Sequence, residues 1–160
     1  MQISKAMSDL MNAQIGNELG ASNQYLQLSA YFDGQALKKL AELFKKQAEE
    51  EREHAMKFFD HLNEVGAPVN IPAIAAPKYD VASAEEAFKM AVDWEKEVTR
   101  QIYAMVDLSI TEKDYASQNF LQWFVAEQVE EVSSMENYLA VVQRAGEKNL
   151  LMLEAYFSHQ

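Results

Sequence analysis

The chain has no cysteine among its 160 residues, only three prolines and only five glycines. The lack of cysteine excludes disulfides, thiolate zinc sites, CxxC redox motifs and rubredoxin-type iron sites. Long stretches without proline or glycine favour long helices over a fold with many tight turns. The sequence also lacks any run of 18 apolar residues, so no membrane-spanning segment is expected.

Basic residues are scarce too, because 14 Lys and Arg stand against 25 Asp and Glu, which gives a formal net charge of −11. Nucleic-acid binding needs a basic surface to neutralise phosphates, so no nucleic-acid partner is expected. The negative charge is compatible with attraction of cations. Residues 1–16 are amphipathic and carry Asp9, unlike a secretory signal, so the expected location is the cytoplasm.

Apolar residues make up 49% of the chain, enough for the core of one domain over residues 1–160. Their periodicity predicts five helices, over residues 4–32, 35–64, 83–111, 114–144 and 149–157. Gly66 is expected to terminate the second helix, and Ser83 with Glu86 forms a capping-box pattern at the start of the third. The three prolines all lie between residues 65 and 82, which predicts a long connection without helix.

The lengths of the connections predict the topology. The short breaks near Gly34 and Lys113 require the helices on either side of each break to be antiparallel. The 18 residues from 65 to 82 can span about 59 Å at ~3.3 Å per residue, whereas a helix of 28 residues is only about 42 Å long. The second and third helices can therefore be parallel. The expected fold is an all-α four-helix bundle with one long crossover and a short C-terminal fifth helix.

Polar residues interrupt the apolar stripe of every long helix. In the second helix, Glu51 and His54 are three residues apart, on the face where leucine is expected. The stripes of the other three helices are interrupted near their middles by Glu18, Glu95, Gln128 and Glu131. Burying an ionised carboxylate without a partner costs many kcal/mol, so a bound cation is the leading explanation.

The interruptions are regularly spaced. Glu18 and Glu51 are 33 residues apart, as are Glu95 and Gln128, and the two halves of the chain are offset by 77 residues. Antiparallel pairing within each half would bring all of them to one depth in the bundle. Two divalent cations would balance the four carboxylates, which would otherwise repel one another and largely protonate. Oxygen-rich ligands with one imidazole suit iron or manganese, and a bridging Glu51 would hold two ions ~3.5–4 Å apart.

Three stretches of the chain form a more specific pattern. They are Asn17-Glu18-Leu19 with Tyr25, Glu50-Glu51 with His54, and the run NFLQWFVAEQVEE from Asn119 to Glu131. Together they closely resemble the non-haem bacterial and archaeal ferritins. The third stretch is highly specific, whereas an ExxH motif alone is a weak signal. The resemblance extends from the first predicted helix to about Gly146 and implies the ferritin-like form of the four-helix bundle.

The resemblance implies a catalytic di-iron centre, the ferroxidase centre, whose two irons share Glu51. One iron would bind Glu18, Glu51 and His54. The other would bind Glu51, Glu95 and Glu131. Because the ligands are family ligands for iron, the resemblance favours iron over manganese.

The family also implies roles for residues around the two irons. Gln128 would lie beside the second iron, and Tyr25 resembles the ferritin tyrosine that hydrogen-bonds a ligand carboxylate. Prokaryotic ferritins of this kind often have a third iron site next to the first two. The residues that match its ligands are Glu50, Glu127, Glu130 and the shared Glu131.

Two departures from related patterns matter. Bacterioferritins have a second ExxH motif and a haem-ligating methionine directly after the glutamate of the first motif. Here the second motif reads Gln128-xx-Glu131 and position 52 is arginine, so no haem is expected. The tail from residue 151 to 157 departs from the usual fifth-helix pattern, which leaves its packing open. His61 and His159 have no neighbouring ligand pattern and are expected at the surface.

The sequence is therefore interpreted as an iron-storage ferritin subunit. It would oxidise Fe(II) with O2 or hydrogen peroxide and store Fe(III) mineral inside a homo-oligomeric shell, which in this family has 24 subunits. A first alternative is a non-storage di-iron peroxidase or oxidase of the rubrerythrin or catalase type, against which the missing cysteine and second ExxH weigh. A second alternative is a structural bundle without metal.

Overall fold

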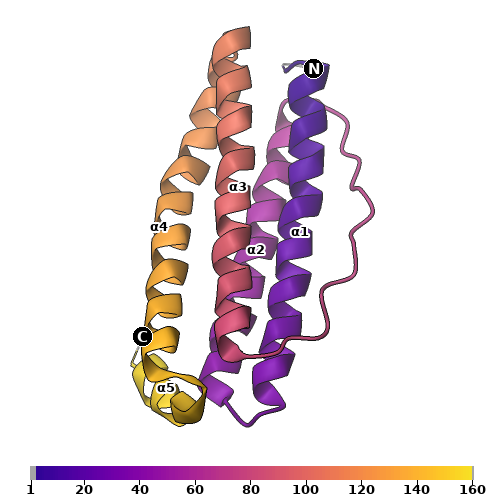
Figure 1. The fold of residues 1–160 in the computed structure, drawn as a ribbon. Coiled ribbons are helices and arrows are strands. Elements are labelled where there is room, and N and C mark those ends of the chain that lie inside the picture. The colour runs from indigo at the N-terminus through magenta and orange to yellow at the C-terminus, as the bar shows by residue number, and fades with distance from the viewer. Residues whose placement is uncertain (1–2, 160) are drawn as a thin grey trace.

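The computed structural model describes residues 3–159 and is a bundle of long helices (Figure 1). In chain order, the elements are α1 (Lys5–Asp33), α2 (Lys38–Glu64), α3 (Ala84–Glu112), α4 (Tyr115–Ala145), a 3-10 turn η1 (Glu147–Asn149) and α5 (Leu150–Phe157). Within residues 3–159 there is no β-strand. The all-α bundle with a short C-terminal helix is thus confirmed.

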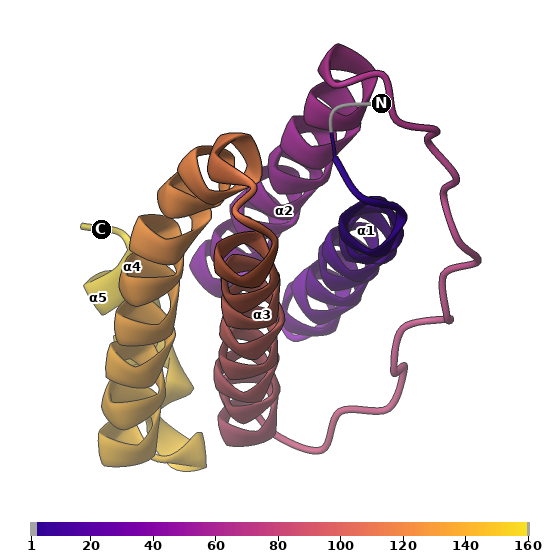
Figure 2. The same ribbon diagram turned by 90° about the horizontal axis from the view of Figure 1, so that it is seen from above.

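The long crossover makes α2 and α3 parallel, as the connection lengths predicted. It runs the length of the bundle and passes around the outer side of α1 before it reaches α3 (Figures 1 and 2). Two amide side chains of α1 hold it. Asn12 donates to the Pro68 carbonyl at 2.9 Å and accepts from the Asn70 amide at 2.6 Å, and Gln24 makes a similar pair of bonds to the backbone of Lys78.

Gly16 allows the crossover to lie close against α1. A Cβ atom at this position would come within 2.4 Å of Pro72 Cγ, far inside van der Waals contact. A larger residue at position 16 would therefore displace the crossover. Glycine in the middle of a helix lowers stability by about 1 kcal/mol relative to alanine. At position 16 it also makes room for the contact with Pro72.

The connection between α1 and α2 differs from the sequence-based prediction. The second helix begins at Lys38 and not at Gln35, because Ala36 has a left-handed conformation with φ of 60°. The Leu37 amide donates to the Phe32 carbonyl and the Ala36 amide to the Asp33 carbonyl, both at 3.0 Å. These are the two bonds of a Schellman motif, which usually has glycine at the left-handed position.

Gly66 occupies that position after α2, as predicted, with φ of 70°. The Ala67 amide donates to the Leu62 carbonyl at 2.9 Å and completes the same motif. Lys113 plays this role after α3, with φ of 55°. Two of the three Schellman turns thus carry a side chain where glycine is preferred.

Replacing Ala36 by glycine is expected to raise the free energy of unfolding by about 0.5–1 kcal/mol, because glycine tolerates a positive φ without steric cost. Ala30→Gly is the matched control, since Ala30 is exposed within α1 and glycine there costs about 1 kcal/mol. Chemical denaturation of both variants measures the two effects. Equal destabilisation by both substitutions would contradict the left-handed turn at Ala36.

The C-terminal helix α5 docks on the start of α2. Leu37, the residue before α2, has no side-chain acceptor, and the Glu154 carboxylate takes its place by accepting from the amides of Lys39 at 2.9 Å and Leu40 at 3.0 Å. A carboxylate at a helix N-terminus is also favoured by the helix dipole. Leu153 and Phe157 of α5 are buried in the core. The sequence left the packing of the tail open. In the structure the tail caps the start of α2 and buries two of its own apolar side chains.

Hydroxyl groups fix the register of α1 against α2. Ser22 Oγ donates to the Ala48 carbonyl and Ser29 Oγ to the Ala41 carbonyl, both at 2.7 Å. This antiparallel register places Glu18 at the level of Glu51. Between residues 3 and 159, none of the helices combines the length and the apolar character needed to cross a membrane.

The interior contains two apolar clusters. One is built around Phe44 and Phe88 near α5, and the other around Met11 and Phe58 near the opposite end of the bundle. Along each long helix, the buried glutamate near the middle stands between the residues of one cluster and those of the other, as Glu51 does between Ala48 and Ala55. A polar layer therefore divides the core at mid-height.

Candidate metal centre

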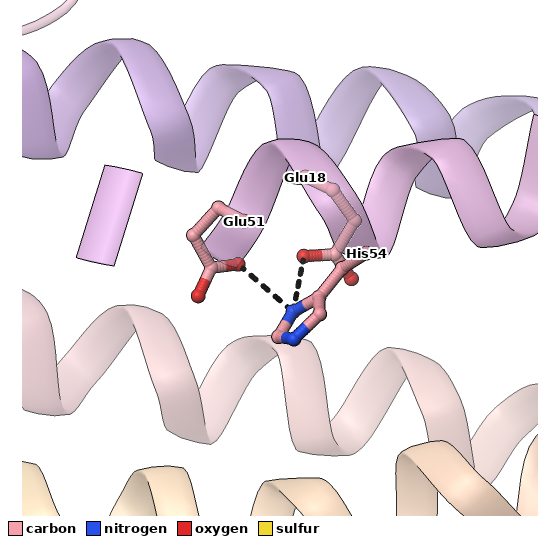
Figure 3. A group of neighbouring side chains, drawn as sticks. All are labelled: Glu18, Glu51 and His54. Atoms are coloured by element: carbon pink, nitrogen blue, oxygen red, sulfur yellow. Dashed lines mark ion pairs between the residues drawn. The ribbon is translucent and has the colours of Figure 1, made fainter. Parts of the chain in front are cut away.

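Glu18, Glu51 and His54 converge inside the bundle and are all buried. Glu18 is on α1, and the other two are one turn apart on α2. His54 Nδ1 lies 3.5 Å from Glu51 Oε2 and 3.9 Å from Glu18 Oε2 (Figure 3). One ligand atom from each residue lies within 4.8 Å of the others, which is close enough for all three to bind one ion.

A second group adjoins the first and shares Glu51 with it. Glu51, Glu95 and Glu131 also offer ligand atoms within 4.8 Å of one another. They come from α2, α3 and α4 and are all buried. Two potential metal sites therefore meet at one carboxylate, and each of the four long helices contributes at least one ligand.

Tyr25 and Gln128 contact the same carboxylate. The Tyr25 hydroxyl donates to Glu95 Oε1 at 2.6 Å, and Gln128 Nε2 donates to Glu95 Oε2 at 3.1 Å. Gln128 Nε2 also lies 3.2 Å from the Glu95 carbonyl and 3.3 Å from Thr99 Oγ1. In this structure the Gln128 amide group therefore orients Glu95 from α4.

Two further glutamines contact the group, and the sequence reasoning assigned them no role. Gln14 Nε2 donates to Glu18 Oε1 at 2.9 Å, and Gln47 Nε2 donates to Glu131 Oε2 at 2.6 Å. Both glutamines are buried. A signal was present in the sequence, because each glutamine comes four residues before a ligand of its own helix, at positions 14 and 18 and at positions 47 and 51.

Burial and mutual repulsion make the carboxyl groups hard to ionise. Burial raises the pKa of Glu18 well above its usual value, and the Glu51 carboxylate raises it further. Burial likewise raises the pKa of Glu51, to which Glu95 adds. Burial, followed by the charge of Glu95, raises the pKa of Glu131 from 4.5 to about 8. A cation entering this group must therefore displace protons.

Four buried atoms at the first group have no hydrogen-bond partner within residues 3–159. They are Glu18 Oε2, Glu51 Oε1, Glu51 Oε2 and His54 Nδ1. An unsatisfied buried polar group costs about 1–3 kcal/mol, and more when it is charged. Cations bound on either side of Glu51 would satisfy all four atoms. Carboxylate oxygens with one imidazole nitrogen are a donor set that fits iron.

Of the four residues expected to form a third site, only Glu127 and Glu131 lie in a group of possible ligands within the described part of the chain. Glu127 Oε1 lies 3.7 Å from His54 Nε2, and Glu127, His54 and Glu131 form a third group of possible ligands within 4.8 Å. Glu50 and Glu130 belong to none of the three groups found among residues 3–159. Glu50 is half-buried with Lys46 Nζ at 3.9 Å, and Glu130 is exposed.

His61 is not at the surface, contrary to the sequence-based expectation, since only 9% of it is exposed. Its ring stacks on Phe120 with centroids 3.9 Å apart. The reason is helical phase, because residue 61 lies two turns beyond His54 on the same face of α2. Burial lowers the pKa of His61, which favours its neutral form. His159 is exposed, as expected.

A family model described as a ferritin-like domain matches residues 8–145 of the chain. The bacterial non-heme ferritin of Staphylococcus aureus strain USA300 is 37% identical over 145 residues, which cover 91% of this chain and 87% of that protein. The bacterial non-heme ferritin of Staphylococcus haemolyticus is 35% identical over 145 residues, with the same coverage of 91% and 87%.

Solved structures agree with these relatives. The open-pore ferritin of the hyperthermophilic archaeon Archaeoglobus fulgidus superimposes with a TM-score of 0.95 at 37% identity, over 99% of this chain and 98% of that chain. A humanized archaeal ferritin gives a TM-score of 0.94 at 36% identity, over 99% and 98% of the two chains. The sequence matches, the bundle and its buried carboxylates together show that this chain belongs to the ferritin family of iron-storage proteins.

Proposed function

We propose that the chain is a ferroxidase subunit that takes Fe(II) as its substrate at two adjacent sites. One site is formed by Glu18, Glu51 and His54, and the other by Glu51, Glu95 and Glu131. The observation that carries the proposal is the shared, fully buried Glu51, which belongs to two three-residue ligand groups. A carboxylate shared in this way can bridge two ions.

The ligands favour the oxidised product over the substrate. Fe(III) is harder and more highly charged than Fe(II), so it gains more from carboxylate oxygens in a dry interior. The reaction balances as two Fe(II) giving two electrons, either to O2 with two protons to form hydrogen peroxide or to hydrogen peroxide with two protons to form two waters. The raised pKa values of Glu18 and Glu131 mean that these carboxyl groups release protons when Fe(II) binds.

We also propose a third iron site beside the first two, with Glu127 and Glu131 as its inner ligands and Glu50 and Glu130 at its outer edge. The grouping of Glu127, Glu131 and His54 supports its inner part. Glu130 faces solvent, so its side chain would have to turn inward to reach an ion at this site.

Glu130→Ala is expected to change the number of Fe(II) oxidised per O2 consumed while leaving the two tight iron sites intact, because Glu130 touches neither group. Oxygen-electrode measurements during Fe(II) addition, with an anaerobic Fe(II) titration, report both quantities. Glu136→Ala is the matched control, since Glu136 is exposed on the same helix and pairs with Lys96 at 2.8 Å. Loss of all tight binding in Glu130→Ala would contradict a separate third site.

Storage requires assembly, and we propose the 24-subunit hollow shell. The structural relatives are ferritins, and the single chain exposes large apolar side chains that an assembly would cover. Leu151 and Met152 on α5 are 77% and 67% exposed, and Tyr115 at the start of α4 is 71% exposed. Isolated apolar residues at the surface are common, but such residues at both ends of the bundle are consistent with contacts between subunits.

Aerobic loading with Fe(II), followed by size-exclusion mass and iron analysis, tests the proposed function. A particle of hundreds of kilodaltons that holds many irons per subunit is the expected result. A small particle that consumes peroxide without retaining iron would instead support a non-storage di-iron enzyme. Oxidation at the rate of buffer alone would support a bundle without metal chemistry.

A further inference from the structure

We propose that Gln14 and Gln47 are positioning residues that set the binding modes of Glu18 and Glu131 and leave Glu51 free to bridge. The inference rests on the proposed ferroxidase function. Each glutamine donates an amide hydrogen to one oxygen of an outer ligand, Gln14 to Glu18 and Gln47 to Glu131. The central ligand, Glu51, receives no donor from residues 3–159 on either oxygen.

Gln14 restricts Glu18 from within α1. The two residues are four apart, so their side chains lie on the same face of the helix, and the bond from Nε2 to Glu18 Oε1 is 2.9 Å long. Gln14 is 2% exposed and Glu18 is fully buried. With Oε1 held, the unpartnered Oε2 faces the ring nitrogen of His54 at 3.9 Å. The first ion therefore meets Glu18 through a preset oxygen.

Gln47 acts across the bundle. It also precedes a ligand of its own helix, Glu51, by four residues, yet its 2.6 Å hydrogen bond goes to Glu131 on α4. Gln47 is also close enough to Glu51 to lower the pKa of that carboxyl group, against the larger effect of burial. Both Gln47 and Glu131 are buried, at 8% and 6% exposure. This choice of partner fixes one oxygen of Glu131 and leaves both oxygens of Glu51 available for two ions.

The neutrality of the donors matters as much as their positions. No lysine or arginine within residues 3–159 forms an ion pair with Glu18, Glu51, Glu95 or Glu131. A cationic donor would neutralise a carboxylate and compete with the metal ion. An amide orients the carboxylate but leaves its charge for the ion, and partners of this kind typically contribute 10–100-fold in metal affinity.

Gln14→Met and Gln47→Met remove the donors while keeping a flexible side chain of similar size. Gln24→Met is the matched control, because Gln24 bonds the backbone of Lys78 in the crossover and no ligand carboxylate. Metal-free wild-type and variant proteins would be titrated with Co(II) without oxygen, with calorimetry giving affinities and visible absorption reporting ligand geometry. Thermal unfolding of the same samples reports stability.

Site selectivity is the expected result. Gln14→Met should weaken one of the two tight Co(II) ions about 10–100-fold and alter its absorption, and Gln47→Met should weaken the other. Gln24→Met should match the wild type in Co(II) affinity and absorption, whatever its thermal stability. Wild-type affinities in both site variants would overturn the positioning role, as would equal weakening of both ions in each variant or a change in thermal stability alone. A wild-type chain that binds fewer than two Co(II) ions would instead overturn the proposed ferroxidase function, and this inference with it.

Discussion

Replacing Glu51 by alanine is expected to slow the fast phase of Fe(II) oxidation by about 100-fold or more, to near the rate in buffer. Glu51 is the one residue that belongs to both principal ligand groups, so its loss removes a ligand from both ions and the only bridge between them. Removing a single group that stabilises charge in a dry site commonly costs a factor of 10²–10³. Stopped-flow absorbance after mixing with Fe(II) in air measures the effect.

The neighbouring ligands give a graded comparison. Glu18→Ala and His54→Ala each remove a ligand from one site and should slow the fast phase strongly, though less than Glu51→Ala. Glu53→Ala is the control, because Glu53 is exposed on the same helix and is expected to react as the wild type. The size of the assembled particle should be unchanged, since the ligands are buried within one chain. Unchanged fast kinetics in Glu51→Ala would remove the proposed bridge.

The second large effect concerns stability without metal. The free energy of unfolding of the metal-free protein is expected to fall as pH rises from about 4.5 to about 8. The pKa values of Glu18, Glu51 and Glu131 are raised by burial and by neighbouring carboxylates. In that interval the folded chain keeps protons that the unfolded chain has lost, so stability declines with pH. For Glu131, a pKa moving from 4.5 to about 8 corresponds to at most about 5 kcal/mol.

Metal should reverse this trend. Cations compete with protons for the same oxygens, so a saturating divalent ion such as Zn(II) is expected to stabilise the protein more at pH 8 than at pH 5. Denaturant titrations at a series of pH values measure how the free energy of unfolding changes with pH, both with and without Zn(II). Glu131→Gln should flatten the metal-free slope because it removes one titrating group. Lowered pKa values at Glu86 and Glu97 act below about pH 4.5, outside this interval. The lowered pKa of His61 opposes the decline, but only below its unfolded value of 6.5 and against several carboxyl groups. Metal-free stability that rises between pH 5 and pH 8 would contradict a buried carboxylate cluster.

Much of the fold could be predicted because the helices are long and their apolar stripes continuous. The connection lengths near Gly34, near Lys113 and at residues 65–82 were sufficient to give the relative direction of each helix. The start of α2 was placed three residues early, because Ala36 adopts a conformation that its side chain disfavours. A glycine-based rule for helix ends assigns the turn to Gly34, whose φ is −62°.

The residues of the candidate centre could be predicted from the sequence where a charged side chain stands at a position that normally holds an apolar one. Glu51 and Glu95 stood out for this reason. Gln14 did not, because an uncharged amide breaks an apolar pattern less clearly and the sequence does not show which carboxylate it meets. His61 was misplaced because an isolated histidine has no ligand pattern, and its burial depends on Phe120 of another helix.

The polar layer also explains how the bundle accommodates so much buried charge. Apolar clusters on both sides of this layer stabilise the fold. The middle of the bundle can therefore consist of polar residues suited to binding a metal ion. Among residues 3–159, the buried polar atoms without a hydrogen-bond partner include Glu18 Oε2 and both oxygens of Glu51. A cation bound there would remove the cost of leaving these atoms unpartnered.

Anomalous diffraction from crystals soaked in Fe(II) without oxygen tests the central claim most directly. We predict two iron peaks inside the bundle, ~3.5–4 Å apart, with Glu51 bound to both, Glu18 and His54 on one, and Glu95 and Glu131 on the other. Crystals in which no ion lies between the four helices, with these carboxylates turned toward solvent, would contradict it.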